Sequence, residues 1–331
     1  MTQPLVSVAM ITYNQASYIG RAIDSVLQQK VSFPIELIVG EDCSTDATRE
    51  IVMNYQARNS RVIRVITSER NVGMFLNLKR VEDACIGRYI AYCDGDDWWH
   101  DPFKLQKQLD YLEHNRGCGL VHSDYDRYYP MSGKVIRNFN ETMQNKPRDN
   151  LDVRSIVRGG RYLFILTCTV VARRQLLKEV VDSDPFLFEP GRFLIGDTQR
   201  WAEIAARSGT HYIDESLSTY TVQEESGSKS KDPIKIPRFG KSLNELFLYL
   251  SDKHNLPMSD KEYFADQWRQ HALQLAFHQM NRGLAEDVRA HKLPWSPKER
   301  LLYYGAKGRA LNKVLMAALS IKHRLIHHRP E

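Results

Sequence analysis

Three carboxylates stand within four residues at one point of the chain, in the sequence Asp94-Gly95-Asp96-Asp97. Oxygen ligands this concentrated suit Mg²⁺ or Mn²⁺, which proteins usually hold through one or two carboxylates together with the phosphates of a substrate. An acidic turn ahead of a helix that begins near Pro102 is the alternative. Because the chain has neither a P-loop nor a G-x-G-x-x-G motif, a metal ion bridging protein and phosphate is the remaining way for this motif to serve a nucleotide.

Polar residues also follow three earlier strand-like segments. They are Thr12, Tyr13 and Asn14, then Glu41, Asp42 and Ser44, then Asn71 and Gly73. The Asp42 carboxylate could accept a hydrogen bond from the N–H of a nucleobase, and the Tyr13 ring could stack against the same base. Alternatively, Asp42 and Ser44 only shape a turn and cap the helix that follows. The residues alone leave both interpretations open.

The segments around these residues alternate between strand-like and helix-like patterns. Apolar runs rich in β-branched residues predict strands at 5–12, 35–39, 62–67 and 89–93. Helical periodicity predicts helices at 17–29, from a cap at Ser44 or Thr45 through Tyr55, and at 74–85. Strands separated by helices indicate a parallel sheet with right-handed crossovers, and ligands of such sheets bind beyond the carboxyl ends of the strands. The polar residues should therefore converge on one crevice.

The second half of the chain has a mixed pattern. We predict a helix after Pro102, strands at 119–122 and 163–172, a helix after Asp197 that ends at Gly209, and short strands at 211–213 and 217–222. A polar segment spans 138–151, and a second one, from Gln223 to Pro237, has the composition of a flexible loop. Beyond Gly240 we predict only helices, at 242–253, 260–283 and 297–326.

Composition excludes several classes of protein. With 331 residues, 42% of them hydrophobic and 26% charged, the chain is large and apolar enough to fold around a substantial core. No apolar run approaches the roughly 20 residues of a membrane span. The apolar stretch 5–11 lacks the flanks of a secretory signal, so we expect a cytoplasmic protein. Five widely spaced cysteines without a C-x-x-C pair favour reduced, buried thiols over disulfides or a zinc site.

The net charge of +6 is concentrated at the C-terminal end. Residues 294–331 contain eight Lys or Arg against two Glu, so the rest of the chain is neutral overall. A neutral body argues against a general nucleic-acid binder. The tail alternates basic residues with Leu and Tyr, which is typical of a helix lying on an anionic membrane surface. The alternative is a terminal helix that packs on the body.

Four segments, taken in their order and spacing, resemble family 2 glycosyltransferases of the GT-A fold over about residues 4–222. These segments are VSVAMITYNQASYIGRAIDSVLQQ, IELIVGEDCSTDATREI, RNVGMFLNLKRVEDACIGRYIAYCDGDDWW and LIGDTQRWAEIA. The resemblance implies an α/β fold with a Rossmann-like, mostly parallel central sheet flanked by helices, followed by a helical C-terminal extension. We accordingly place a catalytic domain at 1–222, with a nucleotide-binding half at about 1–100 and an acceptor half at about 101–222. A flexible loop follows at 223–239, and a helical region at 240–331 ends in the basic tail 294–331.

The resemblance also implies which residues bind the donor, a nucleotide-diphosphate sugar and commonly a UDP-sugar. These residues are Thr12, Tyr13, Asn14, Glu41, Asp42, Asn71, Gly73, Asp94 and Gly95, with Glu41 at a position where many members have Asp. Asp96 and Asp97 match the ligands of a divalent cation, Mn²⁺ or Mg²⁺, on the diphosphate. The common D-x-D register would instead select Asp94 and Asp96, so Asp96 is essential in both registers.

Asp197 matches the general base of the family. It would take the proton of an acceptor hydroxyl while that oxygen attacks the anomeric carbon opposite the leaving diphosphate, which inverts the anomeric configuration. Without the resemblance, a helix N-cap is the simpler interpretation of Asp197. The chain departs from the family at Tyr220-Thr221, where members often have Tyr-Arg. Sugar or acceptor contacts are assigned to Trp98, Trp99, His122 and Asp124, with ordinary packing as the alternative for the two tryptophans.

We therefore predict an inverting, metal-dependent glycosyltransferase that moves a sugar to a hydroxyl of a glycan or lipid-linked acceptor. The resemblance implies bacterial cell-surface polysaccharide synthesis, on the inner face of the cytoplasmic membrane if the tail meets lipid. A nucleotidyltransferase is one alternative, disfavoured by the absence of a Gly-rich, Lys-containing loop after the first strand. A catalytically silent protein that binds sugar nucleotides or membranes is the other, disfavoured by the joint presence of Asp42, Asp96 and Asp197.

Overall fold

The computed structural model describes residues 3–144, 146–159, 165–223, 230, 232–290 and 295–317. The chain divides into two compact units. The first unit comprises Met1–Arg192 and Gly196–Gln223, and the second comprises Phe193–Ile195 and Glu224–Glu331. The described strands all belong to the first unit, whereas the described elements of the second unit are helices.

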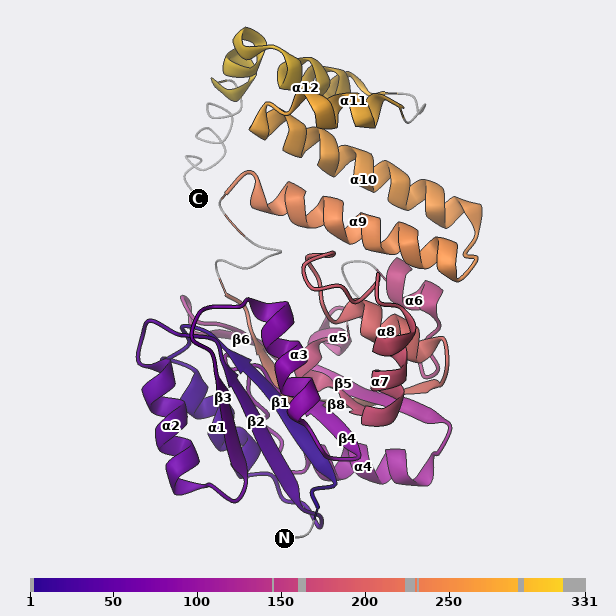
Figure 1. The fold of residues 1–331 in the computed structure, drawn as a ribbon. Helices are drawn as coiled ribbons and strands as arrows, with labels where there is room; N and C mark the ends of the chain where they lie inside the picture. Colours follow the sequence, from indigo (N-terminus) through magenta and orange to yellow (C-terminus); the bar gives the residue numbers. More distant parts are fainter. Residues whose placement is uncertain are drawn as a thin grey trace. The chain divides into compact units, whose positions relative to one another are not determined.

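Four parallel strands form one half of the sheet in the first unit (Figure 1). They are β1 (Val6–Thr12), β2 (Ile35–Glu41), β3 (Ile63–Thr67) and β4 (Tyr89–Tyr92), in the spatial order β3-β2-β1-β4. All four residues of β4 and six of the seven in β1 are buried, as in a parallel sheet covered on both faces. The predicted strands and their parallel arrangement are confirmed.

The other half of the sheet mixes strand directions. β7 (Val171–Arg173) pairs antiparallel with β4 and with β5 (Cys118–Tyr129). β5 also pairs antiparallel with β6 (Lys134–Ile136) and parallel with β8 (Gly209–Thr221). The eight strands form one mostly parallel sheet, so the predicted α/β class is confirmed.

Helices connect the strands and cover both faces of the sheet (Figure 1). They are α1 (Ile19–Leu27), α2 (Thr48–Arg58), α3 (Met74–Ala84), α4 (Lys104–His114), α5 (Phe139–Thr142), α6 (Val153–Arg158), α7 (Arg174–Ser183) and α8 (Thr198–Ala205), with a 3-10 turn at Thr167–Thr169. Alternate β2 residues Leu37 and Val39 point to one face and join the core that α1 and α4 cover. Gly40 faces the opposite side, where Asn77 and Val81 of α3 lie against it.

Two segments of the second half differ from the sequence prediction. The strand predicted at 163–172 is only Val171–Arg173, because the described residues before it turn through Thr167–Thr169; residues 163–164 lie outside the described part of the chain. The strands predicted at 211–213 and 217–222 are one continuous strand, β8, because β5 is long enough to pair along all of it. Register shifts beside Asp124 absorb residues 214 and 215, which interrupt the apolar pattern.

The start of α2 and the five thiols also bear on the predictions. Ala47, not Ser44 or Thr45, occupies the N-cap position of α2, so the predicted cap is wrong.

The five cysteines are free, as predicted. Four of them are buried, and burial raises the pKa of each of these thiols; they are Cys85, Cys93, Cys118 and Cys168. Cys43 is partly exposed and has a left-handed backbone conformation with φ 59°.

The second unit contains α9 (Lys235–Lys253), α10 (Met258–Gln279), α11 (Arg282–Ala290) and α12 (Pro297–Lys307), followed by helical residues 309–317. The helical C-terminal extension is therefore as predicted. The helix predicted at 260–283 ends at Gln279, because Met280 is left-handed with φ 50° and Asn281 accepts a hydrogen bond from Leu284 N–H in α11. The helix predicted at 297–326 is interrupted at Gly308.

The predicted loop and tail fall partly outside the described residues. Of the loop predicted at 223–239, residues 224–229 and 231 are not described, and its last five residues belong to α9, which begins at Lys235. Of the basic tail 294–331, residues 295–317 are described. Across the described ranges, no helix is both long and apolar enough to cross a membrane.

Candidate functional site

The loops after β1 and β2 are bound to each other at the carboxyl edge of the sheet. Asn14 N–H donates to Ser44 Oγ at 3.1 Å, and Thr45 N–H donates to Asn14 Oδ1 at 2.8 Å. Asn14 adopts a left-handed conformation with φ 52°, which places its backbone and side chain against the second loop. The Tyr13 side chain beside it is 43% exposed, so this predicted base-stacking residue is accessible to a ligand.

The Asp42 carboxylate closes the loop that follows β3. Its Oδ1 accepts hydrogen bonds from Val72 N–H at 2.8 Å and Ser68 Oγ at 3.0 Å, and its Oδ2 accepts one from Gly73 N–H at 2.8 Å. Gly73 has φ 86°, a conformation that favours glycine. Asp42 is 2% exposed, and an ionised carboxylate has about four acceptor positions, so Oδ2 keeps capacity for one more donor. The structure thus brings the predicted donor-site residues Asp42, Asn71 and Gly73 together.

Glu41 is fully buried and paired within the protein. Arg49 Nε lies 2.5 Å from Glu41 Oε2, and Ser44 N–H donates to Glu41 Oε1 at 2.6 Å. Arg49 also donates to the carbonyl of Ser68. Because Arg49 and the Ser44 N–H occupy the two carboxylate oxygens, Glu41 stabilises the loops from inside the protein and does not face a ligand.

The acidic motif follows β4, and its three carboxylates have different surroundings. Asp94 and Asp96 are partly exposed. Asp96 Oδ2 accepts a hydrogen bond from Gln223 Nε2 at 3.1 Å. Asp97 is only 4% exposed, and its Oδ1 accepts the Thr221 N–H at 2.8 Å. Asp94 and Asp96 therefore lie at the open edge of the sheet, whereas Asp97 is turned toward β8.

Burial and mutual repulsion disfavour the ionised form of these carboxylates. Burial raises the pKa of Asp94 to about 7, and the charges of Asp96 and Asp197 add to the shift. Burial also raises the pKa of Asp96. The pKa of Asp97 is raised well above its ordinary value by burial and then by Asp96 and Asp94. A cation at this edge would favour the ionised forms of all three.

The donor set fits a divalent cation that a substrate helps to hold. Within the described residues, no group of three or more His, Cys, Asp or Glu side chains is arranged to bind a metal ion. Asp94 and Asp96 nevertheless present two partly exposed carboxylates close enough to repel each other. Mg²⁺ held by one or two carboxylates takes its remaining ligands from water and substrate phosphates, and hard oxygen donors also suit Mn²⁺. The residues fit the predicted ion together with a phosphate-bearing ligand.

Gly95 allows the acidic motif to pack directly against the loop after β1. A Cβ at this position would lie 2.5 Å from Gln15 Oε1 and 2.8 Å from Thr12 Oγ1. Thr12 is 3% exposed and donates to Gln15 Oε1 at 2.8 Å. The Gln15 side chain also lies near Asp96 and favours its ionised form, which partly offsets the raised pKa of that carboxyl group. Thr12 and Gly95 are therefore packing partners below the site, and Gln15 is the residue that connects them to Asp96.

Asp197 lies at the N-terminus of α8 and close to the acidic motif. Its charge contributes to the raised pKa of Asp94, although the two residues lie far apart in the sequence. Thr198 N–H donates to Asp197 Oδ1 at 2.6 Å, and Thr167 Oγ1 donates to Asp197 Oδ2 at 2.9 Å. Asp197 is thus the N-cap of α8, and it is also brought to the carboxylates that the sequence assigned to the donor and its metal.

A buried ion pair fixes α8 relative to the end of β4. Arg200 Nη2 lies 3.1 Å from Glu82 Oε2 of α3, and the two side chains are 10% and 11% exposed. Tyr92 Oη of β4 donates to Glu82 Oε1 at 2.9 Å, and Arg200 also donates to the carbonyl of Gly196. The network therefore holds the residue before Asp197 against the strand that leads into the acidic motif.

The two tryptophans after the acidic motif lie in different surroundings. Trp99 is 3% exposed, and its Nε1 donates to the Cys168 carbonyl at 3.0 Å, so it belongs to the core. Trp98 is partly exposed, but the guanidinium of Arg21 covers its ring, with Arg21 Cζ 3.4 Å from the ring centroid. Trp99 is therefore a core residue, and the Trp98 ring stacks against the guanidinium of Arg21.

His122 and Asp124 lie inside β5. His122 is 2% exposed, and burial lowers its pKa to about 3, so its imidazole is neutral at physiological pH. Asp124 is 2% exposed and accepts hydrogen bonds from the backbone N–H groups of Tyr125, Asn140 and Glu141. Neither side chain reaches the surface, so both are packing residues and not the predicted sugar or acceptor contacts.

Gln15, Thr167 and Arg21 touch predicted site residues but were not themselves predicted. Gln15 directly follows Asn14, so its position after a strand was a usable signal. Thr167 lies in an apolar run that predicts a strand, and Arg21 lies on an amphipathic helix where a basic residue ordinarily faces solvent. Only the folded chain shows the contacts of these last two residues.

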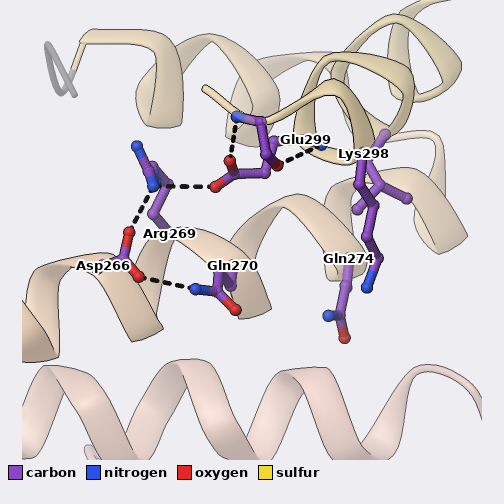
Figure 2. Close-up of a pocket in the computed structure, with 8 residues that line it drawn as sticks. Asp266, Arg269, Gln270, Gln274, Lys298 and Glu299 are labelled. Carbon is purple, nitrogen blue, oxygen red and sulfur yellow. Dashed lines mark hydrogen bonds and ion pairs between the residues drawn. The ribbon is translucent and has the colours of Figure 1, made fainter. Parts of the chain in front are cut away.

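The second unit contains a cavity of about 340 Å³ (Figure 2). It is lined by Asp266, Arg269, Gln270 and Gln274 of α10 and by Ser296, Lys298, Glu299 and Leu302. Arg269 is 5% exposed and pairs with Asp266 and with Glu299, whose Oε1 lies 3.0 Å from Arg269 Nη2. Glu299 Oε2 also accepts the Ser296 N–H at the start of α12. These polar groups join α10 to α12, and none of them was predicted as a site residue.

Comparison with known families decides the identity of the chain. A sequence model described as glycosyl transferase family 2 matches residues 7–180, more than half of the chain. The chain belongs to glycosyl transferase family 2. The matched stretch runs from β1 into α7 and contains the acidic motif, whereas Asp197 lies beyond it. The family expected from the four sequence segments is confirmed.

Curated relatives match parts of this family 2 chain. An uncharacterised protein of Mycobacterium tuberculosis is 45% identical over 107 residues, which are 32% of this chain and 31% of that protein. TuaG of Bacillus subtilis, a putative teichuronic acid biosynthesis glycosyltransferase, is 39% identical over 124 residues, which are 37% of this chain and 47% of TuaG. The matched stretches thus cover 31% and 47% of the lengths of these relatives.

Two solved structures resemble most of the family 2 chain. TarS of S. aureus, in complex with UDP-GlcNAc, is 20% identical with a TM-score of 0.55, and the match covers 93% of this chain and 88% of that one. The mannosyltransferase PcManGT of Pyrobaculum calidifontis, in complex with GDP-Man and Mn²⁺, is 16% identical with a TM-score of 0.56, and the match covers 92% and 80%. At these identities the likeness establishes the fold alone, and the predicted GT-A fold is confirmed.

Proposed function

We propose that this family 2 chain transfers a sugar from a nucleotide-diphosphate donor to an acceptor hydroxyl, with inversion at the anomeric carbon. The network of Arg200, Glu82 and Tyr92 holds Asp197 at the end of β4, where its charge acts on Asp94, and this placement carries the proposal. It puts a hydrogen-bonded, oriented carboxylate next to a pair of carboxylates suited to a metal and a diphosphate. Both groups lie in the first unit. We propose residues 1–222 as the catalytic domain.

The donor nucleotide is proposed to bind over the loops that follow β1, β2 and β3. The exposed Tyr13 ring stacks on the base, and Asp42 Oδ2 offers its remaining acceptor position to a base N–H. Asn14, Asn71 and Gly73 complete the walls of this pocket. We propose a UDP-sugar as donor. The ligands named for TarS and PcManGT, UDP-GlcNAc and GDP-Man, support a nucleotide-diphosphate sugar as the class.

Asp94 and Asp96 are proposed to hold the divalent cation, Mn²⁺ or Mg²⁺. The support is their partial exposure, since Asp97 is buried and committed to the Thr221 N–H. When bound, the cation neutralises the negative charge that develops on the leaving diphosphate. Asp97 then acts by keeping the end of β8 beside the motif.

Asp197 is proposed as the general base. Thr167 and Thr198 donate to different oxygens of its carboxylate, which fixes the orientation of the group. The acceptor hydroxyl gives its proton to Asp197 while its oxygen forms a bond to the anomeric carbon. The bond from that carbon to the diphosphate oxygen breaks, and its electron pair leaves with the diphosphate. Attack opposite the leaving group inverts the anomeric configuration.

The acceptor is proposed to be a glycan or lipid-linked glycan in cell-surface polysaccharide synthesis. The similarity to TuaG, a putative teichuronic acid biosynthesis glycosyltransferase, supports this class. The acceptor half, at about 101–222, contributes Asp197, which must meet the acceptor hydroxyl.

We also propose that the basic tail meets an anionic membrane surface from the cytoplasmic side. In its described part, Leu301, Tyr304 and Val314 are 49%, 59% and 65% exposed, and the basic side chains of Arg300 and Lys313 are exposed among them. Exposed apolar groups interleaved with basic ones suit the interface of an anionic bilayer. Changing the three apolar residues to Ser should abolish co-sedimentation with phosphatidylglycerol vesicles. Undiminished co-sedimentation would contradict the membrane proposal.

Calorimetric titration of UDP, GDP, TDP and CDP, each with and without Mn²⁺, tests the donor site. One of the four should bind in a Mn²⁺-dependent way, and Asp96→Asn should lose that binding while Arg58→Gln, a charge change on the exposed face of α2, keeps it. Binding of none would contradict the proposed function.

Hydrolysis of the matching sugar nucleotide, with water in place of the acceptor, tests the base. Asp197→Asn should bind the donor normally and turn it over at least about 100-fold more slowly. Donor binding by wild type without any turnover would identify a catalytically silent binder instead.

A further inference from the structure

Arg21 is held at the edge of the acidic motif by aromatic rings. Its Cζ lies 3.4 Å from the centroid of the Trp98 ring and 5.3 Å from that of Tyr128. The two rings meet edge to face, with centroids 5.5 Å apart and an interplanar angle of 74°. Arginine stacked in this way is restricted in orientation although its charge stays available for a further partner.

Trp98 places this guanidinium beside the carboxylates. It directly follows Asp97, and its backbone pairs with Thr219 of β8, with Thr219 N–H donating to the Trp98 carbonyl at 2.7 Å. The charge of Asp97 acts on Arg21, although burial is the largest influence and lowers the pKa of the guanidinium. Arg21 therefore lies on the same edge of the sheet as the proposed cation site.

Unlike Arg49 and Arg200, Arg21 has no carboxylate partner among the described residues. Arg49 is paired with Glu41, and Arg200 is paired with Glu82. Arg21 is exposed, and no described carboxylate lies within ion-pair distance of it. Its N–H donors are thus available to an anion that arrives from solution.

We propose that Arg21, supported by Trp98, binds the diphosphate of the nucleotide-sugar donor. This inference rests on the proposed function and adds a residue to its donor site. A planar guanidinium offers two parallel N–H donors to phosphate oxygens, and such charge-assisted pairs are stronger than neutral hydrogen bonds. The guanidinium would neutralise part of the negative charge on the leaving diphosphate, beside the cation that Asp94 and Asp96 are proposed to hold. Trp98 contributes as the positioning residue for Arg21.

The test separates binding of the diphosphate from binding of the base. Calorimetry measures the affinity of wild type, Arg21→Gln, Arg21→Lys and Trp98→Leu for the nucleoside diphosphate that wild type prefers, in Mn²⁺. Ligand-observed NMR measures their affinity for the corresponding nucleoside, which lacks phosphate. Arg58→Gln is the matched control, because it removes the same charge from an exposed position on α2. Thermal melting checks that each variant is folded, and Arg21→Lys supplies the result should Arg21→Gln unfold.

We expect Arg21→Gln to weaken diphosphate binding by about 10-fold to 100-fold, with nucleoside binding unchanged. Arg21→Lys and Trp98→Leu should give smaller losses of the same kind, because each keeps a positive charge but loses the stacked orientation. Diphosphate affinity in Arg21→Gln equal to that of Arg58→Gln would overturn the inference, as would equal losses of diphosphate and nucleoside binding. If wild type binds no diphosphate at all, the proposed function fails and this inference fails with it.

Discussion

Thr167 Oγ1 donates a hydrogen bond to Asp197 Oδ2 at 2.9 Å, from a 3-10 turn that precedes β7. The Thr198 N–H holds the other oxygen, so the carboxylate is bound from two directions by two different elements. The N-cap bond alone would connect the carboxylate only to its own helix, α8. With the bond from Thr167, its orientation is also set by the turn that leads into β7, the strand between β4 and β5.

Thr167→Val should slow turnover by about 10-fold, equivalent to ~1.4 kcal/mol in the barrier. The change removes one hydrogen bond to the proposed base and keeps the shape of the side chain, so KM for the donor should stay the same. Steady-state kinetics with the preferred sugar nucleotide measures both constants. Thr167→Ser is the control, since it keeps the hydroxyl and should keep kcat. An unchanged kcat in Thr167→Val would show that the orientation of Asp197 does not depend on this bond.

Asp97→Asn and Asp97→Ala should behave differently from each other. The Asn side chain still offers an oxygen to the Thr221 N–H, whereas Ala leaves that buried donor without a partner, which costs about 1–3 kcal/mol of unfolding free energy. Urea denaturation measures this difference. Asp97→Asn should also keep Mn²⁺-dependent binding of the nucleoside diphosphate, in contrast to Asp96→Asn. Loss of that binding in both Asp96→Asn and Asp97→Asn would indicate that Asp96 and Asp97 are the metal ligands.

Asp94 should make the metal-free protein less stable as the pH rises. Its folded pKa of about 7 lies above the ordinary value of 3.8, so the folded state holds the proton more tightly than the unfolded chain. Its contribution to the free energy of unfolding is therefore present below about pH 4 and is lost as the pH rises to about 7, by at most about 1.4 kcal/mol per pH unit. Above that range the contribution is constant.

Comparison with Asp94→Asn isolates this effect from the other titrating groups. The variant lacks the ionisation, so its stability relative to wild type should increase from pH 5 to pH 7.5 in urea denaturation with a chelator present. Saturating Mn²⁺ and nucleoside diphosphate should reduce the difference, because a cation favours the ionised carboxylate. Parallel stability curves for the two proteins in the chelator would refute the prediction.

Glu82→Gln or Arg200→Met should each destabilise the first unit by about 3–5 kcal/mol, because each leaves a buried charge without its partner. The double variant should be less destabilised than the sum of the two, since neither charge is then left alone. Denaturation of the four proteins of this double-mutant cycle measures the coupling. Exact additivity would mean that the ion pair does not join α3 to α8.

The sequence was informative where function and fold use the same local pattern. The strands that precede Tyr13, Asp42 and Asp94 were predictable because an apolar run followed by polar residues marks the carboxyl edge of a parallel sheet. The approach of Asp197 to that edge was expected only from the resemblance, because no local pattern connects residues so far apart. The same reason hid the pair between Glu82 and Arg200.

The errors lie where burial decides the role of a polar or aromatic residue. Trp98 and Trp99 are adjacent and chemically identical, yet one is in the core and the other supports Arg21 at the surface. His122 and Asp124 follow the start of β5 and were assigned to sugar or acceptor contacts. The strand continues past them, because β8 pairs along its whole length, and so both side chains are enclosed.

The distribution of the thiols gives this protein a built-in attachment point for a probe. Four of the five cysteines are buried, while Cys43 is partly exposed and directly follows Asp42. A water-soluble maleimide should therefore label the native protein at one position, at the rim of the proposed nucleotide pocket, without any engineered cysteine. A fluorophore attached there would report the arrival of a nucleotide through its emission, and nucleotides could be ranked by titration before any acceptor is known.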